Sequence, residues 1–339
     1  MTQHNPLRRA LVTGGTGFLG QALVAHLRDS GVEVIAFDMR AHPDPSVNSV
    51  VGNICDPAAV RLACAGVDTV FHTAAMIDWG LNKRKQLFAV NVEGTANIVD
   101  ACRSAGVQRL IYTSTVDVVF GGQPIDGGNE DTPYPSHHLD HYGHSKAVAE
   151  RAVLAANGAE LQTCALRVAT LWGPGERFRV TRFVQMARDG KLAALGNGQS
   201  RFSHLYIVNA AHAHRIAAER LAAGTGPAGQ ALFLVDEPPD NFFGFYTPII
   251  EQAGLQANWR WIPAWLLYPF AIVMEWANRL HLTGKDPPLL TRFTVTSTSS
   301  HFWFRGERSR QWLGNYNVVP LAQARAETVR WVKEHLLKQ

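Results

Sequence analysis

A glycine-rich segment close to the start of the chain constrains its fold more than any other feature. Thr13-Gly-Gly-Thr-Gly-Phe-Leu-Gly20 follows a short apolar run that predicts a buried strand, and residues 18–29 predict the helix after it. The glycine at 14 permits a tight turn, Gly17 lets backbone N–H groups approach a pyrophosphate, and the last glycine lets helix pack on strand. Phosphate charge would then lie at the helix N-terminus. The segment therefore predicts a dinucleotide site.

Short apolar runs alternate with helical segments through the first half of the chain. Strands are predicted at residues 33–38, 68–72, 108–113 and 161–168, and helices at residues 85–104 and about 141–157. This alternation indicates an α/β fold with a doubly wound parallel sheet, a Rossmann fold, whose ligands lie at the carboxyl ends of the strands. Runs at 205–208 and 231–235 predict returns to the sheet. We expect a Rossmann domain over 8–170 with returns near 203–238, and a smaller, mostly C-terminal substrate lobe from 171–202 and 239–339.

Tyr142 and Lys146 stand four residues apart in a predicted helix. At this spacing two side chains share a helix face, with Cβ atoms about 5–6 Å apart. A tyrosine has an ordinary pKa near 10, and a neighbouring ammonium, together with a positively charged nicotinamide, would stabilise its phenolate. Tyr-x-x-x-Lys is common on surface helices by chance. Its place after the glycine segment predicts an acid/base pair for hydride transfer at a carbinol or carbonyl carbon.

Hydroxyl side chains end the strand between these two segments, in Tyr112-Thr-Ser-Thr115. At the carboxyl end of a parallel strand, a hydroxyl can hold a substrate oxygen against the tyrosine. Thr115 is the first candidate and Ser114 the second. The alternative is that these hydroxyls only cap the next turn.

Four further positions bear on the cofactor. Asp38 ends the second strand, where a carboxylate can accept both adenosine ribose hydroxyls and would repel a 2′-phosphate, so NAD is favoured. Arg40 lies two residues on and keeps NADP as the alternative. Small side chains around Ala74 would line the cofactor cleft. Asn91, on the long helix, would anchor a water or a backbone carbonyl near the site, or is a plain interior asparagine.

Composition excludes several classes of protein. Hydrophobic residues make up 46% and charged residues 18%, which is typical of a globular chain. A net charge of +4 gives no case for nucleic acid, and four scattered cysteines indicate reduced thiols of a cytoplasmic protein without a signal peptide. The bunched histidines (His137, His138, His141 and His144) fit no common metal site, so no metal is expected.

The longest apolar stretch, Trp261 to Met274, contains two prolines and is shorter than the roughly 20 residues of a membrane-spanning helix. Three interpretations stay open for it. It roofs a pocket for a sterol or alkyl chain, which is favoured, or it forms a core helix broken at Pro269, or it contacts a membrane surface.

These segments resemble those of extended short-chain dehydrogenases/reductases over nearly the whole chain. The matching segments are residues 13–20, 70–75, 91–95, 112–115, 142–146 and 166–175. The resemblance implies that Tyr142 is the acid/base, that Lys146 binds the nicotinamide ribose and tunes the tyrosine, and that Thr115 holds the substrate oxygen. It also implies a homodimer and the following cofactor contacts: Gly14, Thr16, Gly17, Phe18, Leu19, Gly20, Asp38, Asn53, Ile54, Ala74, Asn91 and Lys146.

Within that superfamily the chain resembles the 3-beta-hydroxysteroid dehydrogenase branch, which includes sterol-4-carboxylate 3-dehydrogenases and bacterial 2-alkyl-3-oxoalkanoate reductases. The matching segments are residues 112–120, 288–293, 301–304 and 312–316. Three positions depart from the family pattern. Asn53 replaces an aspartate near the adenine, Val168 replaces a common proline, and residues 201–204 do not match the Arg-Asp-Phe stretch of nucleotide-sugar members.

The resemblance implies an NAD(P)-dependent oxidoreductase that interconverts a secondary alcohol and a ketone on a lipid-like substrate: a 3-beta-hydroxysteroid, a sterol-4-carboxylate or a 2-alkyl-3-oxo acid. Arg177, Arg179 and Arg182 would meet a substrate carboxylate, or form a solvated basic face. The alternatives are a nucleotide-sugar epimerase or dehydratase on the same scaffold, and a regulatory protein that senses NAD(P) without turnover.

Overall fold

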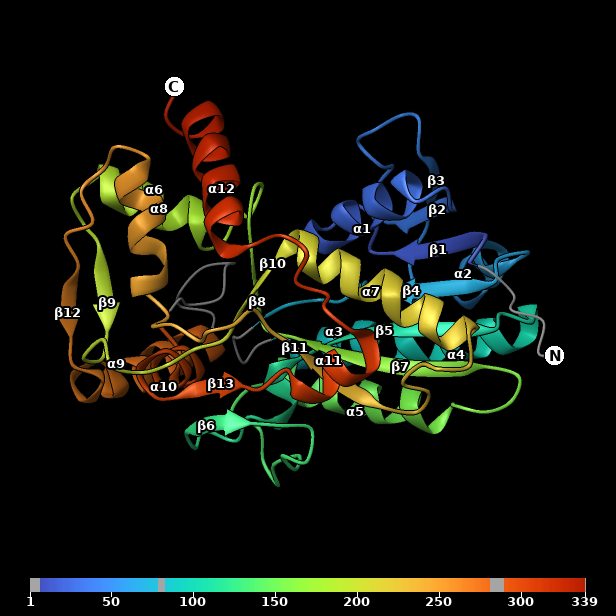
Figure 1. Ribbon diagram of the computed structural model, residues 1–339. Helices are drawn as coiled ribbons and strands as arrows, with labels where there is room; N and C mark the ends of the chain where they lie inside the picture. The colour runs from blue at the N-terminus through green and yellow to red at the C-terminus, as the bar shows by residue number, and fades with distance from the viewer. Residues whose placement is uncertain (1–6, 79–82, 281–289, 339) are drawn as a thin grey trace.

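A seven-stranded, all-parallel sheet forms the centre of the molecule, in the order β11-β7-β5-β4-β1-β2-β3 (Figure 1). The computed structural model describes residues 7–78, 83–280 and 290–338, so part of the motif at 288–293 lies outside the described residues. The strands are β1 (Arg9–Thr13), β2 (Glu33–Asp38), β3 (Asn48–Val51), β4 (Thr69–His72), β5 (Arg109–Thr115), β7 (Gln162–Val168) and β11 (Ala231–Leu234). The chain order reverses between β1 and β4, which confirms the doubly wound fold and puts the ligand crevice of such folds there.

Helices cover both faces of this sheet and create two cores. One face packs against α1 (Phe18–Asp29) and α7 (Ile207–Ala222), and the other against α2 (Pro57–Cys64), α4 (Gly94–Ala105) and α5 (His141–Ala155). Neighbouring strand residues point to opposite faces, so Val12 joins the first core and Leu11 the second. Burial on both faces explains why the strands are continuous apolar runs.

The predicted helix at 85–104 forms, with an irregularity in its middle. It consists of α3 (Arg84–Phe88), a π-helical turn η1 (Ala89–Glu93) and α4. After β5 the chain makes a short 3₁₀ helix, η2 (Val116–Val119), and then strand β6 (Ile125–Gly128) before α5 begins.

The remaining elements gather mainly beside the carboxyl ends of the central strands (Figure 1). Three small parallel pairs occur there: β8 (Thr170–Trp172) with β10 (His204–Tyr206), β9 (Ala193–Leu195) with β12 (Arg260–Ile262), and β6 with β13 (Phe302–Phe304). The helices are α6 (Val180–Arg188), η3 (Gly244–Tyr246), α8 (Thr247–Gln252), α9 (Ala264–Arg279), α10 (Arg292–Ser299), α11 (Glu307–Leu313) and α12 (Leu321–His335). The boundaries of the two expected domains stay a prediction.

One predicted return to the central sheet is wrong. Residues 231–234 join it as β11, but 204–206 pair with β8 instead. The reason is that β8 follows β7 after a single residue, Ala169, but lies outside the central sheet. It is therefore available to pair with residues 204–206. Val208, expected in the strand, already belongs to α7.

The apolar stretch at 261–274 forms β12 and most of α9, with Pro269 inside the helix. The core interpretation is wrong for its large side chains, since Trp265 is 74% exposed and Phe270 63% exposed. The other two interpretations, a pocket roof and a membrane contact, stay predictions. No helix among the described residues is both long and apolar enough to cross a bilayer.

Candidate active site

The glycine segment forms the turn between β1 and α1 as expected. Gly14 has a positive φ of 71°, and its N–H donates to the Phe37 carbonyl oxygen at 2.8 Å. A Cβ on Gly14 would lie 2.7 Å from the Ala74 nitrogen, and one on Gly20 only 2.0 Å from the Gly14 oxygen. A Cβ on Gly17 would meet only the Gly14 oxygen, at 3.1 Å, and Gly17 is exposed. The first and last glycines therefore shape the turn, whereas Gly17 leaves its outer side clear for a phosphate.

Beside this turn, the Asp38 carboxylate lies where β2 ends. It accepts hydrogen bonds from the backbone nitrogens of Thr16 at 3.0 Å and Met39 at 2.7 Å. These contacts fix the carboxylate against the glycine turn, in reach of a ribose bound there. The Arg40 side chain is exposed. Phe18 and Leu19 open α1, with Leu19 buried in the core and Phe18 half-buried.

Asn53 and Ile54 have local structural contacts. The Asn53 carboxamide oxygen accepts from the Cys55 nitrogen at 2.9 Å, so it caps a turn before α2. Ile54 is buried, and its side chain packs where a Cβ on Gly94 would stand 2.8 Å away. Neither contact tests the predicted role near an adenine.

Tyr142 and Lys146 both lie on the buried side of α5, 7% and 3% exposed. The Lys146 ammonium donates to the Thr113 carbonyl oxygen at 2.7 Å and stands 4.1 Å from the centre of the Tyr112 ring. Burial lowers the pKa of Lys146 to about 7, while the charge of Glu150 acts in the opposite direction. The two side chains therefore face the carboxyl end of β5 and are shielded from bulk water.

The phenol of Tyr142 does not have the lowered pKa that a neighbouring ammonium alone would give. Burial raises the pKa of Tyr142 far above its ordinary value, and the carboxylates of Asp117 and Asp140 add to the increase. A hydrogen bond with Thr115 and the charge of Arg179 oppose it. The groups of the protein therefore favour a protonated phenol.

The two predicted hydroxyls lie on opposite faces of β5. Thr115 hydrogen-bonds toward both the Tyr142 phenol and the Asp117 carboxyl group, and its Oγ1 accepts from the Asp117 nitrogen at 3.2 Å. Ser114 is buried, and its Oγ has no hydrogen-bond partner among the described residues. Of the two, Thr115 is the one with a hydrogen bond to Tyr142.

Asp117 and Asp140 form a carboxyl pair beside Tyr142 that the sequence analysis missed. Asp140 caps α5 by accepting from the Gly143 nitrogen at 2.7 Å. Burial raises the pKa of Asp117 to about 6, and burial together with the charge of Asp117 raises that of Asp140 to about 7. An acid before a helix is a capping signal in sequence. Its closeness to the half-buried Asp117 follows only from the packing of η2 on α5.

Asn91 takes part in a hydrogen-bonded line under the site. Its side-chain amide nitrogen donates to the Met76 carbonyl oxygen and to the Ser145 hydroxyl, both at 2.9 Å. Its backbone carbonyl oxygen accepts from the Thr95 hydroxyl at 2.6 Å. Of the roles considered, it holds a backbone carbonyl. The π-helical turn η1 contains Asn91, which is 1% exposed, and such turns often occur at functional sites.

The line continues through His72 to the glycine turn. Since the Thr95 hydroxyl donates to Asn91, it accepts from His72 Nε2 at 2.9 Å, and His72 Nδ1 then accepts from the Thr13 hydroxyl at 2.7 Å. Burial and the charge of Lys146 lower the pKa of His72 to about 3, so the ring is neutral. The strand that precedes the glycine turn is thus tied to the helix that holds Asn91.

A second network missed in the sequence surrounds Glu150, four residues after Lys146. The fully buried carboxylate accepts from Arg167 Nη2 at 2.7 Å and from the Tyr134 hydroxyl at 2.6 Å. Arg167 is 3% exposed. This ion pair fixes α5 against β7 and supplies the negative charge that raises the pKa of Lys146.

The structure separates the three candidate arginines. Arg177 and Arg182 are exposed, whereas Arg179 is half-buried, 5.9 Å from the Phe242 ring centre, and its charge acts on Tyr142, Asp117 and His204. Glu176 holds the start of α6 by accepting from the nitrogens of residues 178, 179 and 180 at 2.7–2.8 Å. Only Arg179 therefore shares the electrostatic environment of the Tyr142 phenol.

The bunched histidines contact one another and their surroundings. His138 Nε2 donates to the Val118 carbonyl oxygen at 2.9 Å, and its ring stacks on that of His144 with centres 5.3 Å apart. Burial lowers the pKa of both.

The fold brings several of the predicted site residues to the carboxyl edge of the central sheet. They are Gly14, Asp38, Ala74, Asn91, Thr115, Tyr142 and Lys146.

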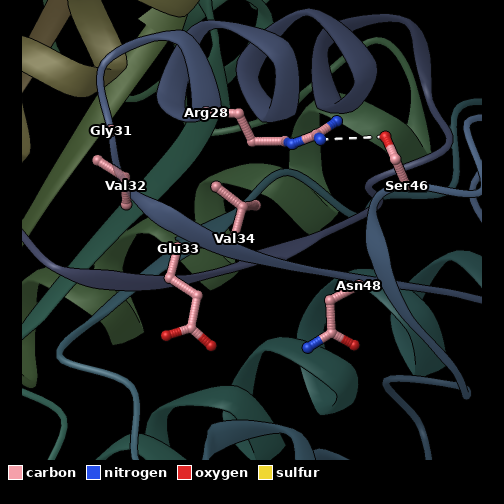
Figure 2. Close-up of a pocket in the computed structure, with 7 residues that line it drawn as sticks. All are labelled: Arg28, Gly31, Val32, Glu33, Val34, Ser46 and Asn48. Atoms are coloured by element: carbon pink, nitrogen blue, oxygen red, sulfur yellow. Dashed lines mark hydrogen bonds between the residues drawn. The ribbon is translucent and has the colours of Figure 1, made fainter.

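Figure 2 shows a separate surface pocket, with Arg28 donating to Ser46 at 3.0 Å. It lies around Gly31 and Glu33, where β2 starts. Ligands of doubly wound sheets bind at the opposite, carboxyl end of the strands. This pocket is therefore not the candidate active site.

Comparison with known sequences gives matches over almost the whole chain. Residues 11–264 match the sequence model of the 3-beta hydroxysteroid dehydrogenase/isomerase family. A Short-chain dehydrogenase/reductase family 42E member 1 of Bos taurus is 37% identical, over 98% of this chain and 88% of that protein. A 3-beta-hydroxysteroid dehydrogenase of Mycolicibacterium neoaurum is 36% identical (96% and 92%), and a 2-alkyl-3-oxoalkanoate reductase of Stenotrophomonas maltophilia 38% identical (92% and 94%).

Solved structures with the same fold cover similar lengths. One titled gox2253 has a TM-score of 0.75 and 26% identity over 96% of this chain and 98% of its own. MoeE5 in complex with UDP-glucuronic acid and NAD has a TM-score of 0.73 and 24% identity over 97% and 100%. At this identity the second comparison bears on the fold alone.

Proposed function

This chain belongs to the 3-beta hydroxysteroid dehydrogenase/isomerase family and is an NAD-dependent oxidoreductase, and we propose that it interconverts a secondary alcohol and a ketone on a lipid-like substrate that carries a carboxylate. The observation that carries the proposal is the buried Tyr142–Lys146 pair at the carboxyl end of β5, beside the glycine turn. When bound, the nicotinamide supplies or accepts the hydride. We propose the same division of labour between a Rossmann domain and a substrate lobe as expected from the sequence.

Tyr142 carries the proton in either direction. In reduction, its phenol donates to the carbonyl oxygen as the alcohol forms, and in oxidation its phenolate accepts the hydroxyl proton. Thr115, which hydrogen-bonds with Tyr142, holds the substrate oxygen next to it. Lys146 lies on the same helix face and stabilises the phenolate, and Ser114 remains a second candidate for the substrate oxygen.

NAD is the preferred cofactor because Asp38 presents a carboxylate fixed beside the glycine turn. A 2′-phosphate placed against this group would be repelled. The exposed Arg40 keeps NADP as the alternative. Relative rates with the two cofactors measure the preference directly.

Arg179 supports an acidic substrate. Of the three arginines considered, it is the one whose charge acts on the phenol of Tyr142. It also lies against Phe242, in the predicted substrate lobe. A guanidinium beside a reacting carbon suits a carboxylate one carbon away, through a charge-assisted hydrogen bond. This favours sterol-4-carboxylates and 2-alkyl-3-hydroxy acids over neutral 3-beta-hydroxysteroids.

Arg179→Gln is expected to lower kcat/KM for a 2-alkyl-3-hydroxy acid by about tenfold to a hundredfold, from the loss of a hydrogen bond to a charged group. The methyl ester of the same acid should lose clearly less, because it offers no negative charge and is affected only through the pKa of Tyr142. Initial rates of NADH formation measure both. Arg177→Gln, at an exposed position, is the matched control. Equal losses for acid and ester would contradict carboxylate recognition by Arg179.

Asp117→Asn is expected to shift the pH profile of oxidation toward lower pH. Asp117 is one of the charges that raise the pKa of Tyr142, so its removal favours the phenolate and brings the rise in kcat/KM to a lower pH. For reduction, which needs the protonated phenol, the high-pH loss of activity should also begin earlier. Profiles of kcat/KM for both directions test this, with the exposed Asp100→Asn as control. An unchanged profile would remove Asp117 from the environment of the phenol.

The nucleotide-sugar epimerase or dehydratase stays the second candidate, on the likeness in fold alone. Such an enzyme keeps its cofactor through a catalytic cycle. NAD that co-purifies with the protein, and no net turnover of added NAD or NADH with hydroxy acids, would favour it over the present proposal. The expected homodimer stays a prediction.

A further inference from the structure

Two side chains of one aromatic cluster each have a buried polar atom without a partner. His204, at the start of β10, is 3% exposed, and Tyr246, at the end of η3, is 1% exposed. Neither His204 Nε2 nor the Tyr246 hydroxyl has a hydrogen-bond partner among the described residues. Burying such an atom unpaired destabilises a fold, and native proteins rarely do so without a reason. Two of them in one cluster indicate a binding site.

Ring contacts place both side chains against the same neighbour, Phe242. The Phe242 ring centre lies 6.3 Å from that of His204 and 6.2 Å from that of Tyr246. The rings of His204 and Tyr246 are themselves 5.9 Å apart, centre to centre. The Arg179 guanidinium lies 5.9 Å from the Phe242 ring centre. Two polar groups and one cation therefore gather around a single apolar side chain.

The electrostatic environment indicates which kind of ligand fits these groups. Burial, together with the charges of Arg179 and Arg325, lowers the pKa of His204 to about 3, so its ring is neutral. Burial raises the pKa of Tyr246 well above its ordinary value, against the charge of Arg179, so its phenol keeps its proton. A phenol and a neutral imidazole with its proton on Nε2 are both hydrogen-bond donors. Two neutral donors beside a guanidinium suit a carboxylate.

The acids around this cluster do not serve as that carboxylate. The charge of Glu176 acts on Tyr246, but its oxygens accept from the backbone nitrogens of residues 178, 179 and 180. Asp240 pairs with Arg325, at 3.7 Å. Neither acid bonds to His204 Nε2 or to the Tyr246 hydroxyl. An acceptor for these two atoms therefore comes from outside the described part of the chain.

We propose that Arg179, His204 and Tyr246 form an anion subsite that holds the carboxylate of the substrate. The Tyr246 hydroxyl and His204 Nε2–H donate to its oxygens, and Arg179 supplies the opposite charge. The subsite rests on the proposed function and extends it from one arginine to three groups. The charge of Arg179 also acts on the Tyr142 phenol, so the subsite and the proton carrier share this arginine. A 3-hydroxy acid fits, because its carboxyl carbon is two bonds from the carbinol carbon.

A carboxylate has to displace a side chain to reach the two donors, because both atoms are buried. Phe242 is the neighbour that all three groups share, and it lies in a turn before η3. Its ring is therefore expected to move as the substrate enters. The alkyl part of a lipid-like substrate would then cover the ring.

Tyr246→Phe tests the subsite, because it removes the hydroxyl and keeps the ring. That hydroxyl has no partner among the described residues, so the thermal unfolding temperature should stay the same or rise. By contrast, kcat/KM for a 2-alkyl-3-hydroxy acid should fall about tenfold to a hundredfold, mainly through KM, from the loss of a hydrogen bond to a charged group. The methyl ester of the acid should lose clearly less. Initial rates of NADH formation measure both.

Tyr316→Phe is the matched control. Tyr316 is also 1% exposed, but its hydroxyl donates to the Val235 carbonyl oxygen at 3.0 Å and accepts from the Val235 nitrogen at 3.1 Å. This change should lower the unfolding temperature and leave the ratio of acid to ester turnover unchanged. His204→Phe, which keeps a ring against Phe245, should lower that ratio as Tyr246→Phe does. Tyr246→Phe decides alone if His204→Phe folds poorly.

Titration calorimetry of the hydroxy acid with protein saturated with NADH measures binding without turnover. Weaker binding to Tyr246→Phe than to the unchanged protein supports the subsite, even where neither acid nor ester is turned over, a result that would refute the proposed function instead. An unchanged affinity and an unchanged ratio of acid to ester in both variants would overturn the subsite and leave the two atoms to a buried water. Failure of the unchanged protein to bind the acid would overturn it too.

Discussion

Tyr142→Phe is expected to lower kcat by about a thousandfold or more in both directions. The change removes the one hydroxyl that the proposal uses to carry the proton, and positioned acid/base groups contribute about 10²–10⁴ to rate. The phenyl ring keeps the packing of a side chain that is 7% exposed, so the thermal unfolding temperature should change little. Single-turnover measurements with NAD and a hydroxy acid give the chemical step.

Two comparisons make this prediction specific. The Kd for NAD, measured by titration calorimetry, should stay within about twofold of the unchanged protein, because Asp38 and the glycine turn are untouched. Tyr268→Phe, on the exposed side of α9, should have full activity with a water-soluble substrate. A Tyr142→Phe protein with more than a tenth of the original kcat would contradict the assignment of the proton to this residue.

Glu150→Gln is expected to lower the free energy of unfolding by about 3–5 kcal/mol, because it leaves Arg167 buried without its counter-charge. Arg167 is 3% exposed and donates to Glu150 through both Nε and Nη2. The same change removes the negative charge that raises the pKa of Lys146. The ammonium would then lose its proton at a lower pH, so any remaining activity should decline earlier as the pH rises.

Urea unfolding followed by circular dichroism measures the first effect. Glu33→Gln is the matched control, because Glu33 pairs with Arg9 at the surface and such pairs contribute about 0–1 kcal/mol. A loss below about 1 kcal/mol for Glu150→Gln would mean that Arg167 finds another partner or water. Activity and stability can be separated by assaying well below the unfolding midpoint.

Local signals in the sequence were enough to predict the central sheet and the positions of much of the candidate site. The glycine segment encodes its own turn, because Gly14 needs a positive φ and Gly20 has no room for a side chain. A four-residue spacing on a helix puts Tyr142 and Lys146 on one face. The buried strands are continuous apolar runs because both of their faces are covered.

What the sequence could not supply depends on contacts between distant segments. Asp117 and Asp140 are separate in the sequence, and only the packing of η2 on α5 makes them a pair that acts on Tyr142. The raised pKa of that phenol was likewise not foreseen, because it arises from burial and from the charges of Asp117 and Asp140. The partner of β10 and the outward direction of the α9 side chains depend on which surfaces other segments already occupy.

The π-helical turn at Ala89–Glu93 has a consequence for how this segment tolerates insertions and deletions. A π turn holds one residue more than an α turn, and successive residues of an α-helix differ in direction by about 100°. Deleting a single residue here would restore regular winding and swing the Asn91 carboxamide away from Met76 and Ser145. The number of residues in this stretch is therefore fixed. A shorter version would need another amide to join it to Ser145 of α5.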